Sequence, residues 1–142
     1  MPYMSLYKKG DMQRLSLRDG DDMGIYPKEE DYTGGVMLSI KDTETDDVLA
    51  CWGVYPVGPF HGELWAFVSD KIRGHGLWLV KSVRQYIDDL IDSGYYHRLE
   101  SIVRADSPEY IRFSKLLGLN PVGKYREDEY LFIEFERVKE NG

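Results

Sequence analysis

One strand–turn–helix unit constrains this chain more than any other feature, and it occupies residues 63–96 of the 142. Residues 63–68 are a short apolar and aromatic run, which predicts a buried strand. A turn containing two glycines follows. Apolar residues then recur at helical spacing over residues 77–93, and Gly94 is placed to end that helix in the left-handed conformation. The apolar positions of the predicted helix are Leu79, Val80, Val83, Tyr86, Ile87, Leu90 and Ile91, of which Leu79, Val83 and Leu90 are expected to be nearly inaccessible.

The turn before this helix could hold an anion. A helix that starts directly after a strand points free backbone N–H groups, and the positive end of its dipole, at the turn. Gly74 and Gly76 lack a Cβ, so an anion could approach the backbone closely, and Lys71 and Arg73 add positive charge. Glycines between a strand and a helix also make turns without any ligand. Both interpretations stand on this stretch alone.

A family resemblance enters at this turn. The segment Arg73-Gly-His-Gly76, after a strand ending at Val68, resembles the acyl-CoA pyrophosphate loop of the GNAT superfamily of N-acetyltransferases. Residues 99–106 resemble the next strand of that family, and residues 107–119 resemble its next helix. The resemblance covers roughly residues 36–138, by order of elements more than by identity. Within the superfamily, the chain looks most like the small internal virion proteins of short-tailed bacteriophages.

The resemblance implies a fold and a site. The fold would be α/β (α+β): a mixed, mostly antiparallel sheet with helices on both faces and a parallel, splayed central strand pair. Acetyl-CoA would be the acyl donor, Glu63 the base that takes a proton from the amine, and Ser114 a weak acid near the leaving thiolate. The donor would contact residues along the turn and the following strand: Val68, Ser69, Arg73, Gly74, His75, Gly76, Leu77 and Asp106.

Three residues depart from the family pattern. Trp78 stands where the family has Gly or Ala near the pyrophosphate, Asp106 where many members have Asn, and Ser114 where active members often have Tyr. Serine is a much weaker acid than tyrosine and reaches less far. Trp78 points roughly 140° from the centre of the apolar helix face, so its indole must be exposed, covered by another segment or turned over the glycine turn. We predict the last arrangement, in which the indole crowds the turn and makes acetyl-CoA binding weak or absent.

Two functions therefore stay open. One is an acyl-CoA-dependent N-acyltransferase that acts on an unidentified amine. The other is a catalytically silent phage protein of the same fold, inside the virion or bound to a host protein, which acts by binding a protein partner. His61, just before Glu63, is a second candidate base because histidine titrates near neutral pH.

The other elements follow from apolar runs and turn residues. We expect an antiparallel hairpin over residues 36–40 and 48–55, a loop at 56–62 and a strand at 98–104. A helix capped by Ser107 and ended by Gly118 should follow that strand. A second hairpin is expected over residues 121–126 and 130–138. In its second strand, Leu131, Ile133 and Phe135 alternate with Phe132, Glu134 and Glu136, so the two sets are expected on opposite faces. The first 35 residues are poorly defined, with a strand at 3–7, a short helix capped by Asp11 that carries Met12, Leu15 and Leu17, and turns at 19–22 and 27–31.

Composition limits the partners. The net charge of −7 argues against non-specific binding to nucleic acid or to an anionic membrane. The three histidines and Cys51, which is expected in the core, show no metal-ligand spacing, and no apolar run could span a bilayer. We expect one soluble domain over residues 1–142, with a core at 36–138, in the host cytoplasm or the virion interior. The sequence leaves the oligomeric state open.

Overall fold

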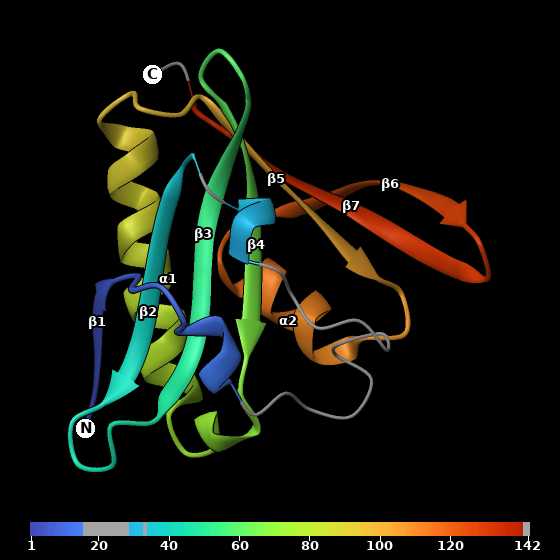
Figure 1. Cartoon of the computed structure of the whole chain (residues 1–142). Helices are drawn as coiled ribbons and strands as arrows, with labels where there is room; N and C mark the ends of the chain where they lie inside the picture. The colour runs from blue at the N-terminus through green and yellow to red at the C-terminus, as the bar shows by residue number, and fades with distance from the viewer. Residues whose placement is uncertain (16–28, 33, 141–142) are drawn as a thin grey trace. The chain divides into compact units, whose positions relative to one another are not determined.

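The computed structural model describes residues 1–15, 29–32 and 34–140 (Figure 1). Seven strands form one sheet in the order β1-β2-β3-β4-β5-β7-β6. Their bounds are Pro2–Leu6 for β1, Val36–Asp42 for β2, Val48–Gly58 for β3, His61–Val68 for β4, Arg98–Arg104 for β5, Asn120–Glu127 for β6 and Tyr130–Val138 for β7. The α-helices are α1 (Gly76–Asp92) and α2 (Pro108–Leu116), and short 3₁₀ turns lie at η1 (Met12–Arg14), η2 (Glu29–Tyr32) and η3 (Asp70–Ile72).

The strand directions confirm the predicted fold class. The pairs β1/β2, β2/β3, β5/β7 and β6/β7 are antiparallel, and β4/β5 is parallel. The parallel register covers three residue pairs, from His61↔Arg98 to Glu63↔Glu100. The helix α1 makes the crossover between these two strands, as a parallel pair requires.

The chain divides into two compact units. Unit 1 consists of Met1–Tyr55 and Leu64–Trp78, and unit 2 consists of Pro56–Glu63 and Leu79–Gly142. The expectation of a single domain stays a prediction.

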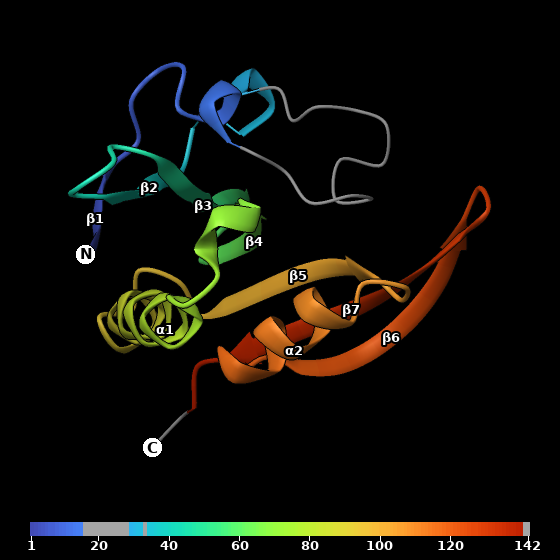
Figure 2. The same cartoon turned by 90° about the horizontal axis from the view of Figure 1, so that it is seen from below.

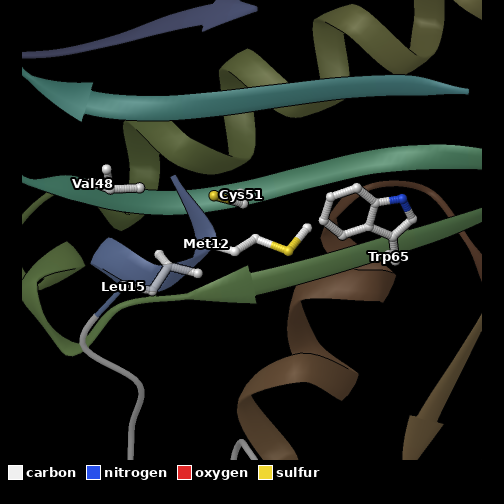
Figure 3. Close-up of a cluster of buried hydrophobic side chains, with 5 residues drawn as sticks. All are labelled: Met12, Leu15, Val48, Cys51 and Trp65. Atoms are coloured by element: carbon white, nitrogen blue, oxygen red, sulfur yellow. The ribbon is translucent and has the colours of Figure 1, made fainter. Parts of the chain in front are cut away.

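The core of unit 1 joins the N-terminal segment to two strands. Met12 and Leu15 pack against Val48 and Cys51 of β3 and Trp65 of β4 (Figure 3). All five side chains are buried, so the expectation that Cys51 is a core residue is confirmed. Leu17 and the turn expected at 19–22 lie outside the described residues, as does part of the turn expected at 27–31.

Gly53 in β3 marks a close approach within unit 1. A Cβ at this position would lie 2.0 Å from the carbonyl oxygen of Val36 and 2.8 Å from the indole ring of Trp65. Distances this short do not occur between real atoms, so only glycine lets β2 and the Trp65 ring come this near to β3.

Asp11 does not cap η1 as predicted. It precedes that turn, but its side chain makes no capping hydrogen bond. Instead its carboxylate accepts hydrogen bonds from the Ser39 hydroxyl (2.7 Å) and the Lys8 N–H (3.0 Å). The ammonium group of Lys41 lies 3.4 Å away, and both charged side chains are buried. The cap prediction was wrong because a distant strand supplied better partners than the helix end.

In unit 2, α2 lies along one face of β5, β7 and β6 (Figure 2). The guanidinium of Arg84 on α1 donates to the carbonyl oxygen of Leu116 at the end of α2 (2.9 Å), which links the two helices. The predicted glycine at each helix end is confirmed, since Gly94 and Gly118 both have positive φ. Among the described residues of this unit, the largest fully buried side chains are Val83, Ile87, Leu99, Leu117, Leu119 and Phe135.

Two predictions were wrong. Leu90 was predicted to be inaccessible but is half-buried. The inaccessible residues of α1 are Leu79, Val83, Ile87 and Ile91, a row with a spacing of four.

The predicted loop at 56–62 is mostly strand: β3 continues to Gly58 and β4 begins at His61. Pro59 presets φ for the first position of the remaining two-residue turn, and Phe60 takes a positive φ of 59° at the second.

Candidate active site

Glu63 lies in β4 beside a second carboxylate. In the parallel pair, Glu63 is the register partner of Glu100 on β5. The Nε2 atom of His61, two residues earlier on the same face of β4, lies 3.4 Å from Oε2 of Glu100. Three titratable side chains therefore meet where β4 pairs with β5.

This environment changes the acidity of Glu63. Burial raises the pKa of Glu63, the negative charge of Glu100 raises it further, and His61 opposes them in part, so the net pKa lies above the ordinary value. A carboxylate with a raised pKa binds a proton more strongly, which suits a general base. The role of Glu63 as a base stays a prediction.

Arg98 forms ion pairs with the carboxylates of Glu100 and Glu136. Arg98 lies on the same face of β5 as Glu100, and its Nη2 atom is 3.7 Å from Oε2 of Glu100. Its Nε atom is 2.9 Å from Oε2 of Glu136 on β7. Leu99, between Arg98 and Glu100, is fully buried on the opposite face. The charged residues thus occupy the face of this sheet opposite Leu99.

Tyr125 on β6 lies close enough to Glu63 for the charge of Glu63 to act on it. Its ring stacks on Phe132 of β7, with centroids 5.4 Å apart. Burial raises the pKa of Tyr125, and the charges of Glu127, Glu134 and Glu63 raise it further. The Tyr125 hydroxyl therefore lies in the field of carboxylates from β4, β6 and β7.

Sequence reasoning missed Glu100, Tyr125 and Glu134. A signal was present for Glu134, because Phe132, Glu134 and Glu136 alternate with apolar residues and so share one strand face. No signal in the sequence placed that face beside Glu63, since this depends on the strand order β4-β5-β7-β6.

The predicted pyrophosphate turn forms in unit 1. Val68 and Ser69 are buried at the end of β4, and the Ser69 hydroxyl caps η3 by accepting from the Lys71 N–H (3.1 Å). The N–H of His75 donates to the Ile72 carbonyl (2.8 Å), which closes the turn before α1. Gly74 has a φ of 87°, a conformation that glycine adopts without strain. The first N–H groups of α1 have no partner inside the helix.

The glycine side of this turn is open. Among the described residues, no heavy atom lies within 4 Å of a Cβ built at Gly74 or Gly76, once their chain neighbours and the nearby backbone of α1 are left aside. Trp78 is half-buried and Leu77 is exposed. The Trp78 indole does not come within 4 Å of either built Cβ. That the indole crowds the turn and weakens acetyl-CoA binding stays a prediction.

Two basic side chains of this region already have carboxylate partners. Lys71 Nζ lies 3.2 Å from Oδ1 of Asp47, and His75 Nε2 lies 4.0 Å from Oδ2 of Asp42. Arg73 is exposed and has no ion-pair or hydrogen-bond partner among the residues the structure describes. Arg73 is thus the cation of the turn that is available to an anion.

Asp106 and Ser114 lie in unit 2. Arg104 donates from Nε to Asp106 (2.9 Å) in a two-point contact, and its guanidinium lies 3.9 Å from the centroid of the Tyr130 ring. This ion pair lowers the pKa of Asp106 and offsets its negative charge. Ser114 is buried on α2, and its role as an acid stays a prediction.

Two negative findings complete the description. No helix among the described residues is long and apolar enough to cross a membrane. Within the same residues, no group of three or more His, Cys, Asp or Glu side chains could hold a metal ion.

The comparisons with known proteins identify the fold. No protein-family model matches the sequence, and no curated protein sequence matches it. Solved structures do match. A GNAT-family acetyltransferase from Bacillus anthracis has a TM-score of 0.76 at 9% identity, over 99% of this chain and 96% of that one. A spermidine N-acetyltransferase from Vibrio cholerae, in complex with CoA and spermine, has a TM-score of 0.76 at 11% identity, over 97% of this chain and 95% of that one.

A third match is a ribosomal-protein-S5-alanine acetyltransferase from Vibrio fischeri, with a TM-score of 0.71 at 10% identity over 99% of this chain and 94% of that one. The chain therefore has the GNAT acetyltransferase fold over nearly its whole length. The resemblance to phage virion proteins stays a prediction.

Proposed function

From this fold, we propose that the protein is an acyl-CoA-dependent N-acyltransferase that acts on an amine, with Glu63 as its general base. The observation that carries the proposal is the position of Glu63, a half-buried carboxylate with a raised pKa, in the parallel strand pair of an acetyltransferase fold. The CoA and spermine in the Vibrio cholerae structure support a thioester donor and an amine acceptor.

The residues of the turn fit the pyrophosphate of such a donor. Gly74 and Gly76 leave open space beside the backbone, and Arg73 is free to form an ion pair. The first N–H groups of α1 have no partner within the helix, so they can donate to an anion. Bound there, the donor would supply an acyl group activated as a thioester. Val68, Ser69, His75 and Leu77 would border it.

The chemistry asked of Glu63 is one proton transfer. An amine that arrives as an ammonium ion must lose a proton before its lone pair can attack the thioester carbon. The Glu63 carboxylate takes that proton, directly or through water, and the C–S bond breaks as the C–N bond forms. The attacking nitrogen carries a second proton that the amide does not keep, and the thiolate that leaves takes this proton. General bases contribute about 10²–10⁴-fold to rates of this kind.

Calorimetry with acetyl-CoA and desulfo-CoA tests the donor site. We expect micromolar binding by the native protein, loss of binding in Arg73→Ala, and retained binding in Glu63→Gln. Arg112→Ala, which removes an exposed arginine from α2, is the matched control. A gain on Trp78→Gly would show that the indole restricts the site from another side.

No heat at millimolar ligand in the native protein or in Trp78→Gly would overturn the proposal. A protein that keeps the fold and acts only by binding a partner would then be favoured.

A further inference from the structure

Glu100 lies beside the proposed base but has no role in the proton transfer described above. It is the register partner of Glu63 in the parallel pair, so the two carboxylates lie side by side on one face. It is also held from two directions, by Nε2 of His61 at 3.4 Å and by Nη2 of Arg98 at 3.7 Å. Arg98 is in turn fixed by Glu136 on β7 at 2.9 Å.

We propose that Glu100 is a positioning residue: its carboxylate, held by His61 and Arg98, faces Glu63 so that the two carboxylates keep one proton between them when an amine gives up its own. This proposal rests on the proposed function. Two neighbouring carboxylates repel when both are ionised, so the first proton to arrive is bound more tightly than by either carboxylate alone.

The surroundings of Glu63 agree with this role. The charged groups that act on Glu63 are His61 on β4 and Glu100 on β5, and the charge of Glu63 in turn acts on Tyr125 of β6. Among the causes that shift the pKa of Glu63, the charge of Glu100 comes second only to burial and acts in the same direction, whereas His61 acts in the opposite direction. Arg98 is already occupied by Glu100 and Glu136, so it is poorly placed to cancel the charge of Glu63.

The test is an NMR titration of the Glu63 carboxyl carbon in protein labelled with [¹³C]glutamate, with the signal assigned through Glu63→Gln. We expect the pKa of Glu63 to fall in Glu100→Gln, to rise in His61→Gln, and to be kept by Glu100→Asp, which preserves the charge. Asp89→Asn, which removes one exposed negative charge from α1, is the matched control and should change nothing. An unchanged pKa of Glu63 in folded Glu100→Gln would overturn the proposal.

The pH dependence of acyl transfer gives the second readout. In Glu100→Gln the acidic limb of the rate profile should move to lower pH and the plateau rate should fall, because Glu63 becomes a weaker base. Glu100→Asp should restore both. A purely structural role for Glu100 would lower stability or raise KM without moving the acidic limb.

These outcomes separate the two proposals. If the protein transfers acyl groups but the pKa of Glu63 is unchanged in Glu100→Gln, the proposed function holds and the proposed role of Glu100 is wrong. If the pKa of Glu63 falls in Glu100→Gln but the protein does not bind acetyl-CoA, the coupling of the two carboxylates holds and the proposed function is wrong.

Discussion

Replacing Asp11 with asparagine should strongly destabilise the protein. The side chains of Asp11 and Lys41 are 3% and 6% exposed, and their charged atoms lie 3.4 Å apart. Removing one partner of a buried ion pair leaves the other charge without compensation, which costs about 3–5 kcal/mol. Asparagine still offers an oxygen to the Ser39 hydroxyl and the Lys8 N–H, so the loss reports mainly the lost charge.

Denaturant unfolding at neutral pH measures this cost. Asp11→Asn combined with Lys41→Met should regain most of the lost free energy of unfolding, because a buried ion pair can be replaced by apolar groups at little cost. Asp46→Asn is the matched control: Asp46 is 78% exposed and lies 3.4 Å from Arg14, so its loss should cost under about 1 kcal/mol. Equal losses in Asp11→Asn and Asp46→Asn would refute the reasoning.

The Asp11 effect should depend on pH. Burial raises the pKa of Asp11, but the hydrogen bonds from Ser39 and Lys8 and the charge of Lys41 together lower it below its ordinary value. The unfolded chain therefore binds this proton more readily than the folded protein. The stabilisation is complete above the unfolded-state pKa of about 4 and is lost as the pH falls through the folded-state pKa. A constant gap between native protein and Asp11→Asn down to strong acid would contradict this account.

Three further changes test other parts of the structure. Glu63→Gln should raise the melting temperature at neutral pH: the folded-state pKa of Glu63 is raised, so its ionised form opposes folding once the pH rises past the unfolded-state pKa. A lower melting temperature at pH 7 would argue against that environment. Gly53→Ala should give little folded protein by circular dichroism, since its Cβ would lie 2.0 Å from the Val36 carbonyl oxygen; a variant as stable as the native protein would contradict the close approach. Ile87→Ala should lower the free energy of unfolding by about 2–5 kcal/mol and Leu90→Ala by clearly less, because Ile87 is fully buried and Leu90 is not. The reverse order in denaturant titrations would place the buried face of α1 elsewhere.

Local patterns in the sequence determined most of the elements. The 3.6-residue spacing predicted α1 to within one residue at each end, and β5 was predicted at its observed bounds. Gly94 and Gly118 marked the helix ends, because a left-handed residue there needs no neighbour other than its own turn. The same reasoning failed at Pro56, which reads as a loop residue but lies within β3. The strand around it overrode the local preference of proline.

Only part of the candidate site could be predicted from the sequence. Glu63 was predicted through the family resemblance, and the strand face of Glu134 and Glu136 through alternation. That Glu100 is the register partner of Glu63 follows from how a parallel strand returns after a crossover helix. Neighbouring residues do not encode that register, so the raised pKa of Glu63 could not be derived from them.

The partners of Asp11 could not be predicted from the residues near it in the sequence. Its position before a short apolar segment favours a helix cap, and in isolation that would be its best partner. In the folded chain, β2 brings Ser39 and Lys41 against it from about 30 residues away. Local chemistry limits what a side chain can bind, but only the tertiary structure decides which distant groups reach it, because a buried carboxylate must satisfy its charge with whatever the fold places beside it.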